Sequence, residues 1–393
     1  MKLGGYIKKY DKRNNELITD NNLGVTKEKT FISSVANTIG TDLSKYKLLS
    51  NNVFACNPMH VGRDKALPIG LYRNNDPAIV SPAYYTFTVK DENELLPEYL
   101  MLWFKHKQTD HIIWFHTDGS VRGGISWEDL CNLDINIPDI TNQKNIVDNY
   151  NNLVKKVENL KEENSILENV ISKLFYDTFL NVDKDIEKKE SACGIIKENY
   201  DVVKLKTILS NVIDNRGKTP KIVQSGKPLL EGMHINMSDS FPDNTLWDKQ
   251  KYVSQSDYEN WFRAGHPIYH DILCATVGTL PKWCMMDNQD IYCIAQNIVA
   301  LRTNELASQF YLYGYMNTKK FINEFNSRIV PAVQPSIKVP HMLDIDIILP
   351  PIEEIKKYDE KVENLYRKIE NNKYELGEYS ILINKVLNII VEV

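Results

Sequence analysis

One helical segment that occurs twice constrains this chain more than any other feature of its sequence. The segment at Asn152–Asn159 reads NLVKKVEN and returns at Asn364–Asn371 as NLYRKIEN (364 − 152 = 212). At the same offset, Val121–Pro138 (VRGGISWEDLCNLDINIP) aligns with Val333–Pro350 (VQPSIKVPHMLDIDIILP). Internal repeats decide architecture, because each copy folds into the same kind of unit. We therefore expect the 393 residues to form a globule and a long helix, twice over.

Weaker matches extend the repeat upstream. Lys2–Leu3 resembles Lys204–Leu205, and NNVFACN at Asn51–Asn57 resembles HDILCAT at His270–Thr276. Two aromatic-rich stretches, each expected to be helical, also fall at corresponding places: PEYLMLWFKHKQ at 97–108 and SQFYLYGYMNTKKF at 308–321. The repeat therefore covers most of the chain.

Both long helices carry the four-and-three spacing of a coiled-coil seam. The first seam is Ile146, Tyr150, Leu153, Val157, Leu160, Asn164, Leu167, Ile171 and Leu174. The second is Tyr358, Val362, Leu365, Ile369, Asn372, Leu376, Tyr379, Ile383, Val386 and Ile390. Each helix is expected to start after a proline, Pro138 or Pro350–Pro351, because proline fits the start of a helix and not its interior.

Each seam has one polar interruption, which predicts a register. Antiparallel pairing that sets Asn164 opposite Asn372 makes every other layer apolar, with Leu160 on Leu376 and Leu167 on Ile369. A slip of one heptad would leave each amide against an aliphatic side chain, at a cost of about 1–3 kcal/mol. We therefore expect pairing within the chain. The alternative is that the asparagines face solvent and the helices pair between two chains.

Composition limits the class of protein. The net charge of −5 excludes a globally basic nucleic-acid binder, so any DNA contact must come from local patches. No apolar run approaches the roughly 18 residues of a membrane span, and the N-terminus lacks the apolar core of a signal peptide. These features predict a cytoplasmic protein without a membrane partner. The six scattered cysteines form no CxxC pair and are expected to be reduced: Cys56, Cys131, Cys193, Cys274, Cys284 and Cys293.

The repeated order resembles the DNA-specificity subunits of type I restriction–modification enzymes. The resemblance rests on GGISWEDLCNLDINIP and SIKVPHMLDIDIILPP, each leading into a helix, with DNRGKTPK at Asp214–Lys221 and HDILCATVGTLPKW at 270–283. It implies two recognition globules that read the halves of a bipartite DNA site. It also implies two methyltransferase subunits and the restriction/translocase subunits as partners. The chain itself would hold no cofactor, since S-adenosylmethionine, ATP and magnesium would bind the partners.

The expected fold class is α+β, with two mixed α/β target recognition domains separated by a long antiparallel two-helix coiled coil in a pseudo-twofold repeat. The expected boundaries are 1–142 for the first domain, 143–180 for the first spacer helix, 181–200 for a linker, 201–350 for the second domain and 351–393 for the second helix. From Ile146 to Leu174 is 28 residues, or roughly 42 Å of helix. Such a spacer suits half-sites about one turn of DNA apart.

Signatures of catalysis are missing from the sequence. NPMH at Asn57–His60 lacks the second proline and the aromatic residue of an adenine-methyltransferase loop. RGKT at 216–219 lacks the glycine of a phosphate loop, because position 212 is Val212. His106, His111 and His116 are spaced by five, about 140° apart on a helix, and share no face for a metal. We expect a non-enzymatic subunit without a metal.

Polar and basic loops supply the candidates for DNA contact, since phosphates attract cations and bases are read by Arg, Lys, Gln, Ser and Thr. The candidates are Arg63, Lys65, Arg73, Ser120, Arg122, Arg216, Lys218, Lys221, Thr279, Lys282, Arg328, Gln334 and Lys338. Each could equally be a solvated surface group.

Three other functions stay open. One is a protein-binding adaptor, with two ligand globules on a coiled coil and no DNA role. A second is a stand-alone methyltransferase, which the missing motifs disfavour. The third is a specificity subunit of a related restriction class, which would read DNA in the same way with different partners.

Overall fold

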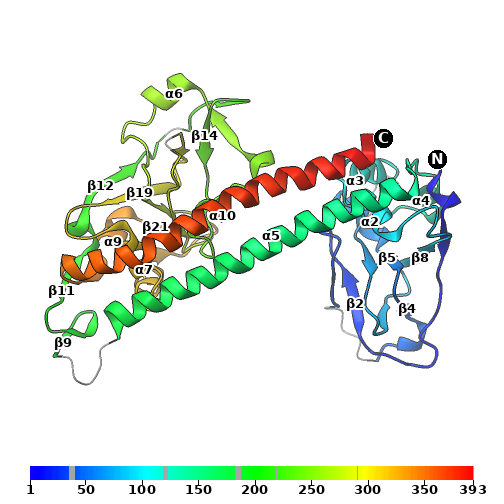
Figure 1. Ribbon diagram of the computed structural model, residues 1–393, viewed down its shortest axis with the longest axis horizontal. Coiled ribbons are helices and arrows are strands. Elements are labelled where there is room, and N and C mark those ends of the chain that lie inside the picture. Colours follow the sequence, from blue (N-terminus) through cyan, green and yellow to red (C-terminus); the bar gives the residue numbers. More distant parts are fainter. Residues whose placement is uncertain (35–39, 118–122, 182–186, 218, 290, 393) are drawn as a thin grey trace. The chain divides into compact units, whose positions relative to one another are not determined.

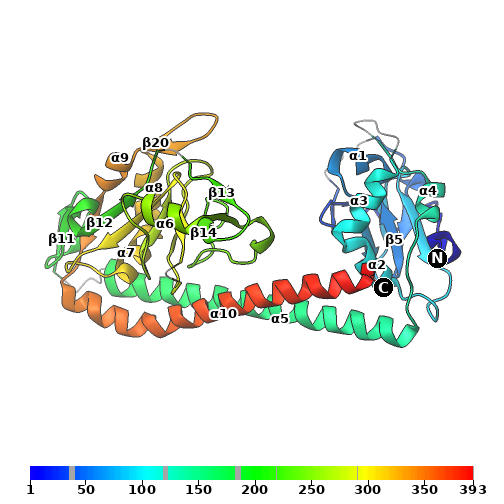
Figure 2. The ribbon, with the colours of Figure 1, turned by 90° about the horizontal axis from the view of Figure 1, so that it is seen from above.

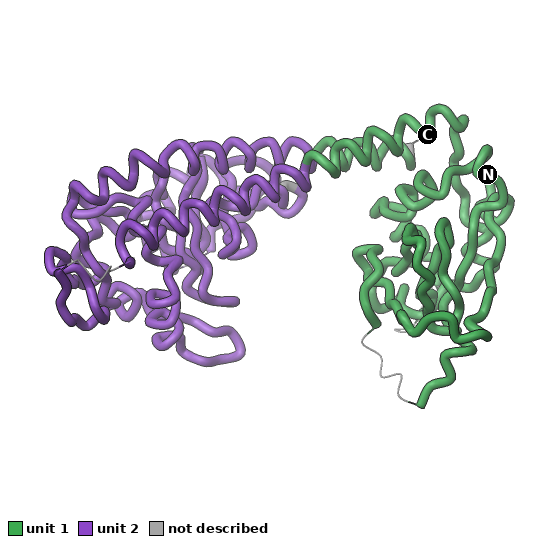
Figure 3. The backbone as a smooth tube through the Cα atoms, turned by 60° about the horizontal axis from the view of Figure 1, so that its bottom comes forward, with its two compact units in different colours: residues 1–156, 381–393 green, residues 157–380 purple. Residues whose placement is uncertain are grey.

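The computed structural model describes residues 1–34, 40–117, 123–181, 187–217, 219–289 and 291–392 (Figure 1). The chain divides into two compact units, coloured separately in Figure 3. Unit 1 comprises residues 1–156 with 381–393, and unit 2 comprises residues 157–380. Each unit contains one β-rich domain and part of two long helices, so the class is α+β, as expected.

The two long helices are α5 (Ile140–Phe175) and α10 (Ile352–Glu392), which run side by side in Figures 1 and 2. Asp139 begins α5, because its carboxylate accepts hydrogen bonds from the backbone N–H groups of Thr141 (3.0 Å) and Asn142 (3.1 Å). Pro351 precedes α10 and its carbonyl accepts from the N–H of Glu354 (2.9 Å). Both helices thus begin beside the prolines that the sequence indicates.

The main sheet of each unit has the same antiparallel order, β1-β8-β5-β6 in unit 1 and β12-β19-β16-β17 in unit 2. The unit 1 strands are β1 (Ile7–Lys9), β5 (Val53–Cys56), β6 (Ile69–Tyr72) and β8 (Tyr85–Val89). The unit 2 strands are β12 (Leu209–Asp214), β16 (Ile272–Ala275), β17 (Trp283–Met285) and β19 (Ile298–Thr303). The matched pair NNVFACN and HDILCAT forms β5 and β16, the third strand of each sheet.

A smaller sheet accompanies each main one and contains one parallel pair, β2–β7 or β14–β18. Its strands in unit 1 are β2 (Asn22–Val25), β3 (Phe31–Ser33), β4 (Lys47–Leu49) and β7 (Ala78–Val80). In unit 2 they are β13 (Ile222–Val223), β14 (Lys227–Leu230), β15 (Lys251–Val253) and β18 (Cys293–Ile294). Three further strand pairs in unit 2 are β9 (Lys188–Ser191) with β10 (Gly194–Lys197), β11 (Asp201–Lys204) with β22 (Asp346–Leu349), and β20 (Ile329–Val330) with β21 (Ser336–Ile337).

Short helices complete the two domains, and four of them correspond in pairs. These are α2 (Pro97–Lys105) with α7 (Gln309–Met316), and α3 (Lys107–Phe115) with α8 (Lys319–Asn326). The helices α4 (Trp127–Asn132) and α9 (Val339–Leu343) also correspond, while α1 (Val61–Asp64) and α6 (Gln255–Asn260) stand alone.

Both aromatic-rich stretches are helical, as expected, and each contains a break between two helices. His106 is extended and its ring accepts from the N–H of Gln108 (3.1 Å), which starts α3. Thr318 likewise accepts from the N–H of Phe321 (3.2 Å) and starts α8. A polar side chain that captures a free N–H group favours a new helix start over continuation.

The internal repeat reaches individual contacts. The hydroxyl of Tyr99 donates to the carbonyl of Asn136 (3.3 Å), and 212 positions later Tyr311 donates to Ile348 (2.6 Å). The weak match at the N-terminus is also structural, since Leu3 N–H donates to Leu133 O (2.9 Å) just as Leu205 N–H donates to Ile345 O (2.8 Å).

An ion pair follows the same repeat. Lys2 Nζ lies 2.8 Å from Asp134 Oδ2, and Lys204 Nζ lies 3.0 Å from Asp346. In each domain this ion pair joins the start of the repeated unit, at Lys2 or Lys204, to the segment that leads into the long helix, at Asp134 or Asp346. The two copies therefore begin and end in the same way.

The long helices pair within the chain and run antiparallel. In unit 1, Ile146 and Tyr150 of α5 pack in one core with Ile390 of α10. In unit 2, Ile171 of α5 packs in one core with Val362 of α10. At the polar layer, Asn372 Nδ2 donates to Asn164 Oδ1 at 2.8 Å, and Asn372 is fully buried. The predicted register is therefore confirmed, and the alternative with solvent-facing asparagines is wrong.

Candidate nucleic-acid interface

Three segments singled out in the second domain meet at the ends of neighbouring strands. They are 214–221 after β12, 276–283 between β16 and β17, and 328–338 around β20 and β21. The N–H of Gly278 donates to Pro335 O (2.9 Å), and the N–H of Ile337 donates to Thr276 O (2.9 Å). Gln296 Nε2 donates to Thr219 Oγ1 at 3.4 Å and so connects the first segment to the start of β19.

An open cavity of about 480 Å³ lies where these segments meet. Its lining is mixed, with amide, guanidinium and hydroxyl groups beside aromatic and aliphatic side chains. The predicted residues Arg216 and Gln334 both line it, as do Asn215, Thr219, Trp261, Val277, Gln296 and Asn297. Polar side chains can form hydrogen bonds with base edges, and apolar side chains can contact the methyl group of thymine. The lining of this cavity contains groups of both kinds.

Arg216 is held in place by its neighbour Asp214. Its Nε lies 2.8 Å from Asp214 Oδ1, and its Nη2 lies 2.5 Å from Oδ2. These hydrogen bonds raise the pKa of the Arg216 guanidinium, which therefore stays charged. Half of the Arg216 side chain remains exposed. A fork fixed on one side by a carboxylate can present its remaining N–H groups outward in a defined direction.

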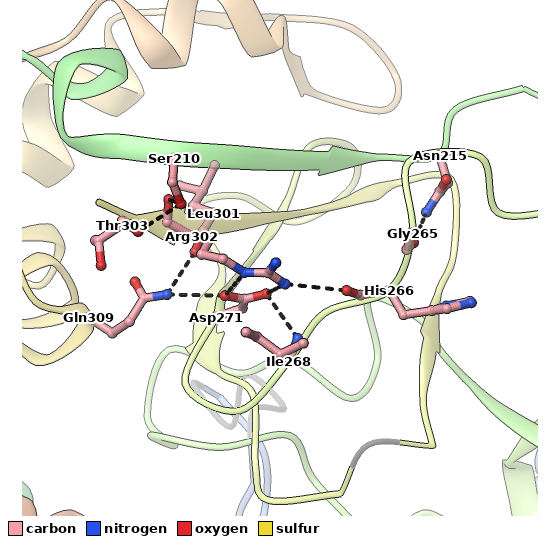
Figure 4. Close-up of polar contacts among 10 residues, drawn as sticks. All are labelled: Ser210, Asn215, Gly265, His266, Ile268, Asp271, Leu301, Arg302, Thr303 and Gln309. Carbon is pink, nitrogen blue, oxygen red and sulfur yellow. Dashed lines mark hydrogen bonds and ion pairs between the residues drawn. The ribbon is translucent and has the colours of Figure 1, made fainter. Parts of the chain in front are cut away.

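A polar network around the buried Asp271 joins β16 and β19 at the end opposite the cavity (Figure 4). Asp271 is fully buried and accepts from Arg302 Nη2 (2.7 Å), from the N–H of Ile268 (2.9 Å) and from Gln309 Nε2 (3.1 Å). Asn215 Nδ2 donates to Gly265 O at 2.9 Å. The segment before β16 is thus tied to β19 on one side and to the Arg216 segment on the other.

The first-domain candidates have different surroundings. Arg63, in α1, pairs with Asp64 (2.7 Å), and Lys65 Nζ lies 5.0 Å from the ring centroid of Trp114. Arg73 follows β6 and bonds both Asn52 and Glu98. Arg63 also contacts His60, with 3.0 Å between Arg63 Nη2 and His60 Nδ1, and Arg63 and Lys65 lie together at the end of one short helix.

The remaining candidates divide by exposure. Lys221, Thr279, Gln334 and Lys338 are exposed. Lys282 is partly buried and donates to Gly232 O (3.4 Å), and Arg328 is held by Glu324 Oε2 (2.6 Å). Ser120, Arg122 and Lys218 lie outside the described residues.

Sequence reasoning missed several residues at this cavity. Gln296 and Asn297 line it from the turn between β18 and β19, and Trp261 lines it from the end of α6. The polar Gln-Asn pair between two apolar strands is the signal that could have found them. Val333, at the tip of the β20–β21 hairpin, does not line the cavity and was not a candidate, because an isolated valine in a sequence predicts core.

All six cysteines are free thiols, five of them buried. Burial raises the pKa of Cys56 and of Cys274 to about 12, so both are inert thiols at neutral pH. Among the described residues no group of three or more His, Cys, Asp or Glu side chains could hold a metal ion.

Comparison with known proteins gives a consistent result. The family model described as the type I restriction modification DNA specificity domain matches residues 13–169. The MjaVIII specificity subunit of a type I restriction enzyme from Methanocaldococcus jannaschii is 22% identical over 314 residues, which is 77% of this chain and 71% of that protein. The putative MjaX specificity subunit of the same organism is 20% identical over 391 residues, 96% of this chain and 85% of that protein.

The fold agrees with a solved structure as well. The crystal structure of the S subunit of a type I restriction–modification system from M. genitalium aligns with a TM-score of 0.54 at 16% identity. The alignment covers 98% of this chain and 94% of that chain.

Fold, repeat and family match together define a DNA-specificity component of a restriction–modification complex. Residues 13–169 are a member of the type I restriction modification DNA specificity domain family, and the chain is similar over most of its length to specificity subunits of type I restriction enzymes. The chain is a non-catalytic member of its complex, and the cofactors are bound by the modification and restriction subunits. The adaptor and methyltransferase alternatives do not fit this membership. None of the helices in the described part of the chain is long and apolar enough to cross a membrane.

Proposed function

We propose that this chain reads a two-part target in double-stranded DNA, with one half read by each β-rich domain. The observation that carries the proposal is the internal repeat, which extends to matched hydrogen bonds such as Tyr99–Asn136 and Tyr311–Ile348. Two copies of one reader in a single chain suit a target with two halves, as dimeric readers suit two half-sites.

The proposed domains are 1–142 and 201–350, joined by spacer helices at 143–180 and 351–393 and a linker at 181–200. A stiff helical spacer fixes the separation of two readers, because each residue adds about 1.5 Å of helix. Insertions in both helices at matched positions should therefore change the gap in the target and leave its two halves unchanged.

The proposed DNA contacts of the second domain are Arg216, Gln334 and their neighbours around the cavity. Arg216 has a fixed and charged fork, which suits a guanine edge, while Gln334 suits adenine. Lys218, Lys221, Thr279, Lys282, Arg328 and Lys338 complete this set, and Arg63, Lys65, Arg73, Ser120 and Arg122 form the set of the first domain. The cations among them are assigned to phosphates, which fix position more than sequence.

The proposed partners are two methyltransferase subunits, bound through the helical regions, and the restriction/translocase subunits. A chain with a net charge of −5 has little electrostatic attraction for DNA as a whole. Firm binding is therefore assigned to the complex, in which the partners add phosphate contacts. The place of action is the cytoplasm, where the DNA target is.

Methylome sequencing tests the function. Cells that express this chain with its modification subunits should carry a bipartite methylated motif that disappears when the chain is deleted. Exchange of residues 201–350 for the same domain of another specificity subunit should change one half of the motif only. A motif without two parts, or no loss on deletion, would overturn the proposal. Co-purification identifies the partners and separates the type I assignment from a related restriction class.

A further inference from the structure

The β20–β21 hairpin has an apolar tip that the fold does not use. Val333 has a relative exposure of 104%, so its side chain is covered by nothing in the described part of the chain. The loop that carries Val333 projects from the second domain on the side away from α5 and α10 (Figure 2). A β-branched side chain in such a position adds nothing to the core and costs free energy in water.

Two further valines share one face with Ser336 of this hairpin: Val330 lies in β20, and Val277 lies in the segment after β16. Val330 pairs directly with Ser336, and Ser336 in turn bridges Val277. Residues directly opposite each other in antiparallel pairs point to the same face, so Val330 and Val277 flank Ser336 there. Both are exposed, at 42% and 36%. The tip and this face form a small apolar surface, which we call the valine surface: Val277, Val330 and Val333.

Two prolines restrict the tip of the hairpin, and a basic residue flanks each end: Lys338 is exposed, and Arg328 is paired with Glu324. Pro331 and Pro335 enclose the tip and restrict its backbone, which lowers the entropy lost when it binds a partner. Gly278 N–H anchors the hairpin through Pro335 O at 2.9 Å. Arg328 immediately precedes β20 and Lys338 immediately follows β21. An apolar tip between two cations matches DNA, where apolar base groups lie between lines of phosphates.

We propose that Val333 reads the C5-methyl group of a thymine in the major groove of the half-site bound by the second domain. This inference rests on the proposed function and adds a specificity-determining residue to it. Thymine alone presents a methyl group in that groove, and an aliphatic side chain reads it by apolar contact. A wedge between base steps is a poorer fit for Val333, because the side chains used as wedges are Phe, Leu, Ile, Met and Pro.

The test uses the chain assembled with its modification subunits. The DNA is a duplex with the sequence of the motif found by methylome sequencing, without deoxyuridine in the reference duplex. Each thymine of the motif is replaced singly by deoxyuridine, which removes the methyl group and keeps the base pairing. At least one replacement, in the half-site that changes when residues 201–350 are exchanged, should weaken binding about fourfold, the factor expected for one buried methyl-sized group. Val333→Ala should weaken binding of the unmodified duplex about as much and abolish the effect of that replacement.

Ile195→Ala is the matched control, because Ile195 is an exposed aliphatic residue (61%) on the separate β9–β10 hairpin. It should leave both the affinity and the deoxyuridine effect unchanged. If no replacement in that half-site weakens binding, or if Val333→Ala retains the effect, the Val333 assignment is wrong while the proposed function stands. If the assembled complex binds no DNA sequence selectively, the proposed function itself fails.

Discussion

The side-chain amide of Asn372 donates to Asn164 Oδ1 at 2.8 Å and to Glu163 Oε2 at the same distance. Lys368 Nζ lies 3.3 Å from the same Glu163 carboxylate. One polar layer thus contains two asparagines, a carboxylate and a cation, and the neighbouring seam residues are apolar. Such a layer favours one register, because any slip leaves buried amide groups without partners.

The polar layer yields the first prediction. Asn372→Leu should lower the free energy of unfolding by about 1–3 kcal/mol, because Asn164 and Glu163 lose their donor. Asn164→Leu combined with Asn372→Leu should recover most of that loss, since an apolar layer replaces the polar one. Urea unfolding of the two variants measures this. A double variant as unstable as the single one would show that the amides do not act as a pair.

The buried ion pair between Lys373 and Asp287 yields the second. Asp287 is fully buried and Lys373 is 7% exposed. Lys373→Met should cost about 3–5 kcal/mol in urea unfolding, because it leaves an unpaired buried carboxylate. Burial already raises the pKa of Asp287 against the opposing charge of Lys373.

Without Lys373 that pKa should rise further, so the folded variant would bind a proton that the unfolded chain releases. The stability lost in Lys373→Met should then return as the pH falls towards 5. Addition of Asp287→Leu should remove this acid rescue. A single variant whose deficit is the same at pH 5 and pH 8 would contradict the explanation.

Glu168 provides the third prediction. Burial is the main cause that raises its pKa from 4.5 to about 7, although its carboxylate accepts from the N–H (3.0 Å) and hydroxyl (2.9 Å) of Ser240. The folded state therefore binds this proton more tightly than the unfolded state does. The stability that it contributes is complete below about pH 4.5 and is lost as the pH rises through about 7.

Glu168→Gln should remove this dependence and keep an acceptor for Ser240. Above pH 7 the variant should be more stable than the parent, by at most about 3 kcal/mol. Nearby Asp239, whose pKa is raised mainly by burial, leaves a residual dependence. Parallel unfolding curves at pH 5 and pH 8 measure the difference, and equal pH slopes for variant and parent would disprove the role of Glu168.

Arg216 provides the fourth. Arg216→Gln should reduce the affinity of the complex for its target by about 1–3 kcal/mol and relax the preference at one base pair, because a bidentate base contact is lost. Lys221→Gln should weaken binding to all sequences alike and lower its salt dependence. Competition binding with single-base variants of the target distinguishes the two effects.

Arg367→Gln is the matched control for Arg216. Arg367 is also a half-exposed arginine in an ion pair, with Glu363 at 2.8 Å, but it lies on α10. It should leave the order of preference among the target variants unchanged. An Arg216→Gln complex with an unaltered preference at every position would mean that Arg216 binds a phosphate or nothing.

The sequence by itself determined the repeat, the two long helices and the Asn164–Asn372 layer. These properties depend on spacing along one chain and on the 3.6-residue period of a helix, so they can be counted in the sequence. The sequence did not identify the further side chains that join this polar layer. Glu163 and Lys368 join it only because neighbouring turns of α5 and α10 face each other in the folded protein.

Only the tertiary structure decided which candidate residues meet. Arg216 and Gln334 are 118 positions apart in the sequence (334 − 216 = 118) and line one cavity because antiparallel strands bring their loops to the same edge. The structure also decided that Val333 is exposed and not core, and that Arg73 has two partners of its own. Strand pairing joins residues distant in sequence, and no local periodicity encodes which loops it brings together.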